Sequence, residues 1–518
     1  MTPNIATRPA FPEENIPPTA GMTTKVVKGS LWTLAGQVAP LAVSLIATPF
    51  TIRLLGSEGY GVLIFVGLIP AYFGFADLGM GLASTKFGSE AYAASDPERE
   101  ARTVRTAAIL ALISSLPFAI AIFLLSGTLA TLFNVPAHLH SEASLAFKVA
   151  SFTFVLDFLN NIFNTPQLDR LRMDLNTFAT SGVRILGVAA TPIVIYFGGG
   201  VLGAVMVLLA ASLLTLACHV YTSGRLLPDL YGLSLDRGLV RPMVKFGGGM
   251  AISAIASMTM MNFEKAALPK LTSMADLAYY SVAFTLAFTM TLFSVALAQS
   301  LIPAFSQLQG STNRAQLSGL YSRAIRMNLF WLTPVLVLLA IYAKPLITLW
   351  AGPDFGREST RPFYILLIGV GFHVIATPAR AALMASGRSD VIAKTVWLEL
   401  LPYITIVVVL TLRFGGIGAA IAWSLRAVVD AVVSFWLTSR VSKVWFIFRG
   451  TSAFILATVI MSAPFLLLEM MIPSSYLAVS AVTAGSLILF AIIVLRNVLE
   501  SDELEWLKGW VDNRFGRE

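Results

Sequence analysis

Charged residues are scarce in this chain of 518 residues: 12% are Asp, Glu, Lys or Arg, and 56% are hydrophobic. Soluble domains carry about 25% charged residues. A chain with so few charges cannot cover a water-facing surface in the usual way, which argues against a soluble fold. The composition indicates an all-α protein that crosses a membrane several times.

Cysteine is almost absent, since Cys218 is the single one, and this excludes an internal disulfide framework. The four histidines, His138, His140, His219 and His373, show no spacing typical of metal ligands, so we expect no metal and no cofactor. The chain has no Gly-rich phosphate loop that would support ATP hydrolysis. We interpret the net charge of +8 as basic cytoplasmic loops and not as nucleic-acid binding.

Long apolar runs are abundant. A membrane-spanning helix needs about 20 mostly apolar residues. Fourteen segments of the chain are candidates: 29–54, 60–85, 105–127, 146–168, 177–197, 200–221, 244–268, 278–305, 327–349, 362–386, 392–412, 416–438, 450–471 and 475–496. The loops between them are short, so we expect no inserted soluble domain.

The basic residues orient the spans. If the N-terminus is cytoplasmic, most of the 36 Lys and Arg residues fall in segments on the cytoplasmic side. This asymmetry predicts that both termini are cytoplasmic. We see no signal peptide and expect residues 1–24, which are polar and Pro-rich, to form a disordered cytoplasmic tail. Residues 499–518 are predicted to hold an amphipathic helix on the inner face, with a solvated tail as the alternative.

The chain carries signs of an internal repeat. "LATLFNVP" (129–136) resembles "LITLWAGP" (346–353) at an offset of 217 residues, and Phe197-Gly-Gly matches Phe414-Gly-Gly at the same offset. We therefore predict two parallel six-helix lobes, because an even number of spans returns the chain to the same side. The predicted parts are an N-lobe (25–221), a cytoplasmic linker (222–243), a C-lobe (244–441) and two added spans (442–498). Duplicated lobes around a midplane site are typical of alternating-access transporters.

Charged side chains inside the spans need an explanation, because burying one costs roughly 2.5–3.5 kcal/mol even on a lenient insertion scale. Basic side chains that face one cavity between the lobes would suit a phosphate or pyrophosphate headgroup. Acidic side chains could pair with them or take up a coupling ion. The basic candidates are Arg53, Arg184, Lys265, Lys270 and Arg426, and the acidic candidates are Asp77, Asp157, Glu264, Glu399 and Asp430.

Several of these charges also have structural explanations. Arg426 and Asp430 are four residues apart on one helix face and could neutralise each other. Lys270 and Arg380 could extend to the membrane interface, and Arg53 could be an ordinary anchor at a helix end. The sequence leaves these alternatives open.

Asp77 lies in "FADLGMG" (75–81), where several glycines allow the helix to bend. Its carboxylate could cap the backbone of the continuing helix. It could also pair with a cation of the same lobe, or take up a proton or Na⁺. The sequence does not separate these roles.

Three stretches resemble the polysaccharide transporter family, which holds the O-antigen and oligosaccharide flippases. They are "KGSLWTLAGQ" (28–37), "RLLGSEGYGV" (53–62) and "ADLGMGLASTKF" (76–87), and "LAYYSVA" (277–283) resembles a second-lobe counterpart of "EGYGVLI" (58–64). The superfamily also includes multidrug and toxin extrusion transporters and lipid II flippases. The resemblance extends over all fourteen spans, but its motifs are loose and indicate the superfamily better than the substrate.

The resemblance implies a monomer in the bacterial inner membrane that moves polyprenyl-pyrophosphate-linked oligosaccharides from the inner to the outer leaflet. The implied route is a V-shaped cavity between two six-helix bundles, in which cations bind the pyrophosphate. No strict motif exists for these cations, so the five basic candidates are assigned by expected location. The resemblance also implies coupling to H⁺ or Na⁺ through the acidic candidates.

Two other functions stay open. A small-molecule exporter of the same fold would need an acidic, aromatic cavity, and the buried charge here is mixed. A membrane glycan polymerase would be an enzyme, and such enzymes usually carry a large external loop with catalytic carboxylates. The external loops here are short, so we expect a transporter without catalytic residues.

Overall fold

The computed structural model describes residues 19–232, 234–309, 314–446, 453–454, 456–462 and 476–497, and every regular element in these ranges is helical. Within them, seven helical runs are long and apolar enough to cross a membrane, and three of these runs have 47, 54 and 53 residues. The structure therefore confirms an all-α, multi-pass membrane protein. The count of fourteen spans stays a prediction. Residues 1–18, the predicted helix at 499–518 and much of the predicted span 450–471 lie outside the described residues.

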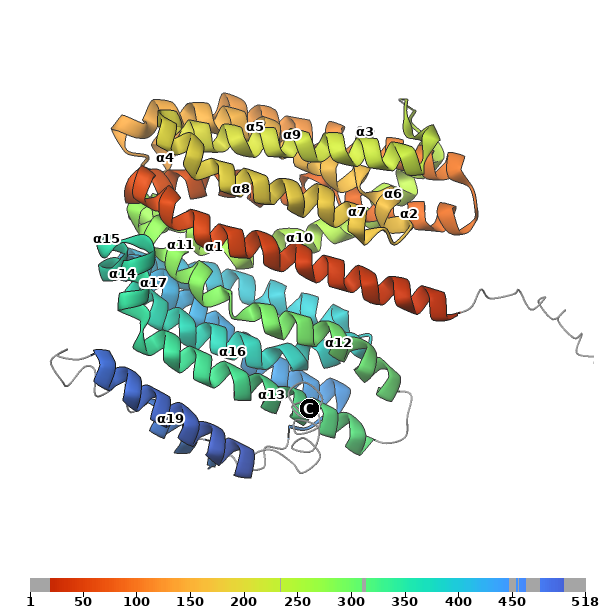
Figure 1. Cartoon of the computed structure of the whole chain (residues 1–518). Helices are drawn as coiled ribbons and strands as arrows, with labels where there is room; N and C mark the ends of the chain where they lie inside the picture. The colour runs from red at the N-terminus through yellow and green to blue at the C-terminus, as the bar shows by residue number, and fades with distance from the viewer. Residues whose placement is uncertain are drawn as a thin grey trace, which may run out of the picture.

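The N-terminal half forms one helical bundle, which we call the N bundle (Figure 1). Its helices are α1 (Thr19–Tyr72), α2 (Met80–Ala93), α3 (Pro97–Leu124), α4 (Ser126–Leu132), α5 (His140–Phe163), α6 (Thr165–Asp169), α7 (Met173–Thr177), α8 (Val183–Val194) and α9 (Gly200–Leu226).

The following helices form a second bundle, the C bundle, and α19 (Tyr476–Asn497) lies beside its helix α13 (Figure 1). The C bundle consists of α10 (Arg237–Leu271), α11 (Met274–Phe288), α12 (Thr291–Gln309), α13 (Arg314–Ile341), α14 (Ala343–Ala351), α15 (Pro353–Glu358), α16 (Thr360–Ala385) and α17 (Ser389–Leu437). Below, the linker end of the molecule is the end where residues 227–236 join the bundles, and the far end is the opposite one.

Two glycine kinks divide the longest helices into pairs of arms. Gly56 in α1 has φ 69°, and Gly415 in α17 has φ 56°. A positive φ is strained for residues with a Cβ, so glycine suits these reversals at the far end. Gly198, at the matching position of the first Phe-Gly-Gly, also has a positive φ of 88°. The two glycines share a positive φ but differ in ψ, which is 12° at Gly198 and −135° at Gly415, so the repeat stays a prediction.

One hydrophobic core joins the two bundles at the far end. It includes Phe65 and Phe147 of the N bundle and Leu268, Tyr280 and Trp423 of the C bundle, all 1% exposed or less. Burial of large apolar and aromatic side chains is the main source of packing energy here. The far end is therefore closed by packing across the bundle boundary.

Polar contacts reinforce the closure of the far end. The Asn134 Nδ2 donates to the carbonyl oxygens of Pro269 and Lys270 at 3.1 and 3.0 Å. The Trp350 Nε1 donates to the carbonyl oxygen of Leu45 at 2.8 Å. These bonds connect segments that are far apart in the sequence.

At the linker end, the bundles touch through two glycines. A Cβ built on Gly79 would lie 2.7 Å from the Gly247 carbonyl oxygen, and one built on Gly247 would lie 2.1 Å from the Leu78 carbonyl oxygen. Lys86 places its ammonium 4.7 Å from the ring centre of Phe246 in α10. Glycine allows this close backbone approach between η1–α2 and α10.

Two predicted boundaries were wrong. Residues 19–24, which we expected in the tail, belong to α1, whose first residue directly follows Pro17-Pro18; proline is tolerated at a helix start and unfavourable within one. The predicted linker 222–243 is shorter, because α9 continues to Leu226 and α10 begins at Arg237. Asp236 caps α10 by accepting a hydrogen bond from the Gly238 amide at 2.8 Å.

The glycine contact gives a testable prediction. Gly247→Ala should destabilise the protein by about 1–3 kcal/mol, because the new methyl group overlaps the Leu78 carbonyl. Gly248→Ala is the matched control, since a Cβ there meets nothing within 4 Å and alanine is the better helix former. Thermal unfolding of the purified proteins measures both. A Gly247→Ala protein as stable as Gly248→Ala would contradict the described contact.

Candidate functional site

A cluster of ionisable side chains lies inside the C bundle. Glu264 of α10 is 0% exposed, and its Oε2 accepts a hydrogen bond of 2.7 Å from the Tyr403 hydroxyl of α17. The other oxygen, Oε1, is buried and makes no hydrogen bond of ordinary geometry in the described structure, and the buried Tyr280 hydroxyl interacts electrostatically with the same carboxylate. A buried carboxylate oxygen without such a bond is costly, so this atom is a candidate position for a proton or a ligand.

Aromatic rings contact the basic side chains of this cluster. The Arg426 guanidinium lies 5.4 Å from the ring centre of Tyr403 and 5.5 Å from that of Trp423. The Lys265 ammonium lies 4.1 Å from the ring centre of Phe284. Such cation–π contacts partly replace the hydration that a buried cation loses.

Asp430 pairs with Arg380 of α16 and not with Arg426. The Arg380 Nη1 donates to the Asp430 Oδ2 at 2.5 Å, and both side chains are at most 20% exposed. The Arg380 Nη2 also donates to the His373 carbonyl oxygen at 3.0 Å. The pairing of Arg426 with Asp430, and the extension of Arg380 to the interface, are therefore not observed. Helix α16 supplies a partner that sequence spacing could not reveal.

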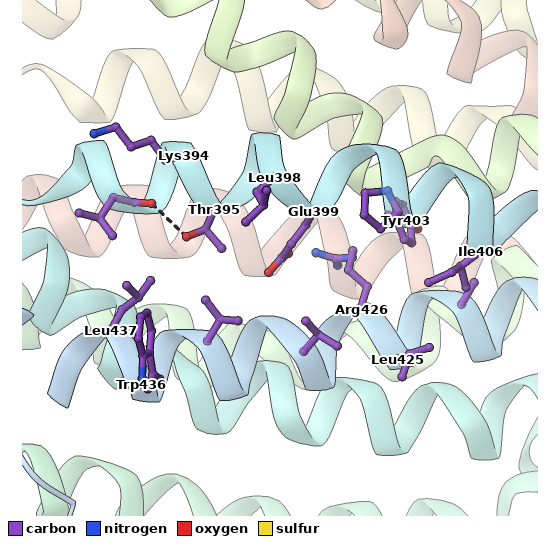
Figure 2. Close-up of a pocket in the computed structure, with 15 residues that line it drawn as sticks. Lys394, Thr395, Leu398, Glu399, Tyr403, Ile406, Leu425, Arg426, Trp436 and Leu437 are labelled. Carbon is purple, nitrogen blue, oxygen red and sulfur yellow. Dashed lines mark hydrogen bonds between the residues drawn. The ribbon is translucent and has the colours of Figure 1, made fainter. Parts of the chain in front are cut away.

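The two arms of α17 enclose a cavity of about 570 Å³ (Figure 2). Glu399 from one arm and Arg426 from the other point toward one another in the space between the arms and attract each other electrostatically. Most of the other lining side chains are apolar, such as Leu398, Leu425 and Trp436. This cavity therefore suits a hydrocarbon chain better than a polar headgroup.

The ionic cluster reaches the boundary between the bundles. Tyr72, in the second arm of α1, packs against the core shared by the two bundles and interacts electrostatically with Glu264. Its hydroxyl is buried and has no hydrogen-bond partner in the described structure. A change of charge at Glu264 would therefore alter the electrostatic environment of Tyr72 in the N bundle.

A second cavity, of about 640 Å³, lies inside the N bundle between α1, α5, α8 and α9. It brings together two residues predicted from the sequence, Asp157 of α5 and Arg184 of α8. In contrast to the cavity of the C bundle, its lining is rich in amide and hydroxyl groups. The polar members besides Asp157 and Arg184 are Thr153, Asn160, Asn161, Asn164, Asn176, Thr180, Ser212, Thr215 and His219.

Hydrogen bonds fix part of this lining. The Ser212 hydroxyl donates to the Asp157 Oδ1 at 2.7 Å, and the Asn160 Nδ2 donates to the Ser212 hydroxyl at 3.1 Å. His219 lies between Gln167 and Thr180, at 3.1 and 3.2 Å from them. Thr180 belongs to a π-helical turn, η3 (Phe178–Gly182), and such turns occur frequently at functional sites.

The other predicted site residues lie apart from these cavities. Arg53 is exposed and donates to the Leu349 carbonyl oxygen at 2.7 Å at the far end, where Lys270 is also exposed. Neither they nor Lys265 line the two described cavities. The described structure therefore distributes the five basic candidates over three places: Lys265 and Arg426 lie in the cluster of the C bundle, Arg184 lies in the cavity of the N bundle, and Arg53 and Lys270 lie at the far end.

Asp77 has a structural role. Its Oδ1 accepts a hydrogen bond of 2.8 Å from the Gly79 amide, and its Oδ2 lies 3.4 Å from the Gly81 amide. It ends the 3₁₀ turn η1 (Gly74–Asp77), after which Leu78 and Gly79 adopt left-handed conformations and α2 begins. This is the capping alternative, and the described residues show no ion pair at Asp77.

The sequence analysis missed the polar residues that complete both sites. Asn160, Asn161 and Asn164 stand together in an apolar span, and this spacing could have indicated a polar helix face. Tyr403 gave no such signal, because a tyrosine in a span usually indicates the membrane interface.

The family and the relatives of the chain agree with the fold. The model of a family described as "Polysaccharide biosynthesis protein" matches residues 52–357. A putative O-antigen transporter of Shigella flexneri is 22% identical over 422 residues, which cover 81% of this chain and 99% of the relative. A probable low-salt glycan biosynthesis flippase of Haloferax volcanii is 27% identical over 170 residues, covering 32% of this chain and 34% of the relative.

Solved structures share the architecture. The lipid II flippase MurJ in an inward closed conformation superposes with a TM-score of 0.70 at 14% identity, covering 91% of this chain and 99% of MurJ. An inward-facing multidrug transporter of the MATE family gives a TM-score of 0.66 at 16% identity, covering 78% and 95% of the two chains. At such low identity these likenesses establish the fold alone.

The buried ion pair of the C bundle gives a second prediction. Asp430→Leu should lower the free energy of unfolding by about 3–5 kcal/mol, because it leaves Arg380 buried without its counter-charge. Replacing both residues, as Arg380→Met with Asp430→Leu, should recover most of this loss. Thermal unfolding of the single and double variants measures the difference, and equal destabilisation by both variants would contradict the pairing.

A third prediction concerns Asp169 at the linker end, just beyond the predicted span 146–168. Burial raises the pKa of Asp169 to about 7, although Ser89 donates a hydrogen bond of 2.7 Å to its Oδ1. Because the folded-state pKa is raised, stability is full below the unfolded value near 4 and is lost as the pH rises to about 7. Asp169→Asn should remove this part of the pH dependence.

The measurement is the unfolding temperature of wild type and Asp169→Asn between pH 4 and pH 8. Asn cannot ionise and so resembles the protonated side chain. The two proteins should differ most at the alkaline end, where the variant should be the more stable. Parallel pH profiles would contradict the assignment of this titration to Asp169.

Proposed function

This chain belongs to the polysaccharide biosynthesis protein family, and from that premise we propose that it is a flippase for a polyprenyl-(pyro)phosphate-linked oligosaccharide. The proposed direction is from the inner to the outer leaflet of the bacterial inner membrane, with both chain termini in the cytoplasm. The proposed mechanism is alternating access of the two bundles, in a protein that acts as a monomer. The product would serve polysaccharide biosynthesis.

The observation that carries the proposal is the polar cavity of the N bundle, together with the buried cations of the C bundle. A sugar headgroup cannot cross hydrocarbon unaided, because each unmatched hydroxyl costs a few kcal/mol and isolated charges cost far more. The N bundle offers a polar cavity of about 640 Å³, and the C bundle holds buried cations beside the bundle boundary. The name of the Shigella flexneri relative, which the match covers almost completely, supports the same function.

The basic side chains receive two roles in this proposal. Arg184, Lys265 and Arg426 are the candidates for binding the phosphate groups during the crossing, since Arg in particular offers a fork of donors. Arg53 and Lys270, exposed at the far end, are the candidates for contact with the headgroup on release. An outward-moving anion would gain about 2.3 kcal/mol per charge for each 100 mV of inside-negative potential.

Two acidic side chains are candidates for coupling to H⁺ or Na⁺. Glu264 has one buried oxygen without a hydrogen bond of ordinary geometry in the described structure and is linked electrostatically to Lys265 and Arg426. Asp157 faces the cavity of the N bundle and is held by Ser212. Uptake of a proton by either carboxylate would change the net charge that a phosphate meets.

A small-molecule exporter is the second candidate, because a multidrug transporter of the MATE family shares the fold. A cationic drug would need a carboxylate without a nearby cation. In the described structure, Asp430 is paired with Arg380, and Glu264 and Glu399 lie near cations. The charge distribution therefore favours an anionic headgroup over a cationic drug.

The fourth prediction is made for vesicles that contain the purified protein and a fluorescent lipid-linked oligosaccharide. Wild-type protein should accelerate the movement of the sugar between leaflets over protein-free vesicles. Arg184→Ala and Arg426→Ala should each slow the movement about tenfold or more, as expected for a lost hydrogen bond to a charged group. Arg357→Ala, whose side chain is 72% exposed, is the control and should behave like wild type.

Two results would overturn the proposal. One is movement of the lipid-linked sugar at the protein-free rate in the presence of wild-type protein. The other is proton- or Na⁺-driven export of a cationic dye by the same vesicles without any movement of the sugar, which would identify the exporter instead.

A further inference from the structure

If the proposed function holds, the side chains that line the cavity of the N bundle indicate which part of the substrate it binds. We propose that this cavity binds a sugar residue of the lipid-linked glycan, with Asp157 and neighbouring asparagines accepting hydrogen bonds from sugar hydroxyls and Arg184 binding an adjacent anionic group. The two described cavities would then divide the substrate, because the cavity of the C bundle is lined mostly by apolar side chains.

The size of the cavity fits an organic ligand. Its volume of about 640 Å³ lies within the range of roughly 300–1,000 Å³ that is typical of small-molecule sites. A bound ion or a single water would need only a small part of that space, since a water molecule takes about 30 Å³. The cavity is therefore too roomy for a site that holds an ion alone.

Hydrogen bonds fix the orientation of two polar side chains that line this space, Asp157 and Asn160. The Asn160 Nδ2 is committed to the Ser212 hydroxyl and carbonyl oxygen at 3.1 and 3.3 Å. Its Oδ1 is consequently left without a partner, in a side chain that is 9% exposed. One turn earlier, the Asp157 carboxylate uses Oδ1 for Ser212.

Further amides extend the set of acceptors. The Oδ1 atoms of Asn164 and Asn176 are buried and have no partner within the described structure, and both residues line the cavity. Asn161 lines it as well and has an exposed side chain. An amide can both donate and accept, as a sugar hydroxyl can. Asp157 and Asn161, whose side chains are exposed and line the cavity, can bind sugar hydroxyls, whereas an apolar drug would leave them unpaired.

Arg184 argues against a site that holds a metal cation alone. It lines the same cavity as Asp157, is exposed to it, and makes no ion pair among the residues that the structure describes. A guanidinium raises the cost of a metal cation nearby and favours an anion. A sugar joined to a phosphate, or a sugar acid, combines the hydroxyl groups and the charge that this lining requires.

The test is a binding measurement on the full chain in lipid nanodiscs with two probes. One probe is a lipid-linked oligosaccharide, and the other is the same polyprenyl pyrophosphate without sugar. Asp157→Asn should weaken binding of the glycolipid about tenfold, and Asn161→Ala about threefold, as expected for hydrogen bonds of their kinds. Binding of the sugar-free probe should change by less than about twofold, because its phosphate meets Arg184 in both variants.

The controls separate this inference from folding and from the proposed function. Asp174→Asn makes the same substitution at an exposed carboxylate that pairs with Arg172 outside the cavity, and it should bind both probes like wild type. Asn161→Ala alters an exposed side chain with no hydrogen bond in the described structure, so its folding should be unaffected.

Four outcomes would overturn the inference. If wild-type protein moves and binds the glycolipid and both variants bind it normally, the inference is wrong but the proposed function stands. If the substitutions weakened binding of the two probes equally, they would act on binding of the phosphate and not on binding of the sugar. A Na⁺ requirement that disappears in Asp157→Asn, for both probes alike, would identify a cation site. Wild-type protein that binds neither probe would remove the proposed function and the inference together.

Discussion

The cost of placing ionisable groups at membrane depth is the constraint on which the rest of this structure depends. The C bundle meets it by internal neutralisation: Arg380 holds Asp430, Tyr403 donates to Glu264, and aromatic rings contact Arg426 and Lys265. The N bundle meets it differently, since Asp157 and Arg184 share a cavity without an ion pair between them in the described structure. The open polar space lies in the N bundle, and the pair Arg380–Asp430 lies in the C bundle, although the N bundle also holds a buried pair, Arg170 with Glu100.

The arrangement of the bundles makes this difference useful to a transporter. A shared aromatic core and the bonds of Asn134 and Trp350 close the far end. At the linker end the contact depends on Gly79 and Gly247, which present almost no side-chain surface. Tyr72 connects the N bundle to Glu264 at the boundary. A change of charge at Glu264 could therefore alter the packing between the bundles, which is the coupling that alternating access requires.

Sequence patterns predicted the helices well because apolar runs of about 20 residues have few alternatives in a membrane. They also located the reversals, since Gly56 and Gly415 fall in the gaps between predicted spans. Side-chain partners were harder to predict. Asp430 stands four residues from Arg426, yet its partner comes from α16. Asp77 was one of several candidates for ion coupling, and the structure shows that it caps the left-handed turn at Leu78 and Gly79, a local backbone feature. The contact between Asp430 and Arg380, in contrast, depends on tertiary packing, which one sequence does not encode in its spacing.

The most direct test of this division between the bundles compares two variants in vesicles that carry a fluorescent lipid-linked oligosaccharide. One variant replaces the buried pair of the C bundle by apolar residues, Arg380→Met with Asp430→Leu, and the other is Arg184→Ala in the cavity of the N bundle. The account predicts that the double variant keeps at least about half of the wild-type transfer rate, while Arg184→Ala loses about nine-tenths of it. A fully active Arg184→Ala protein beside an inactive but folded double variant would contradict it.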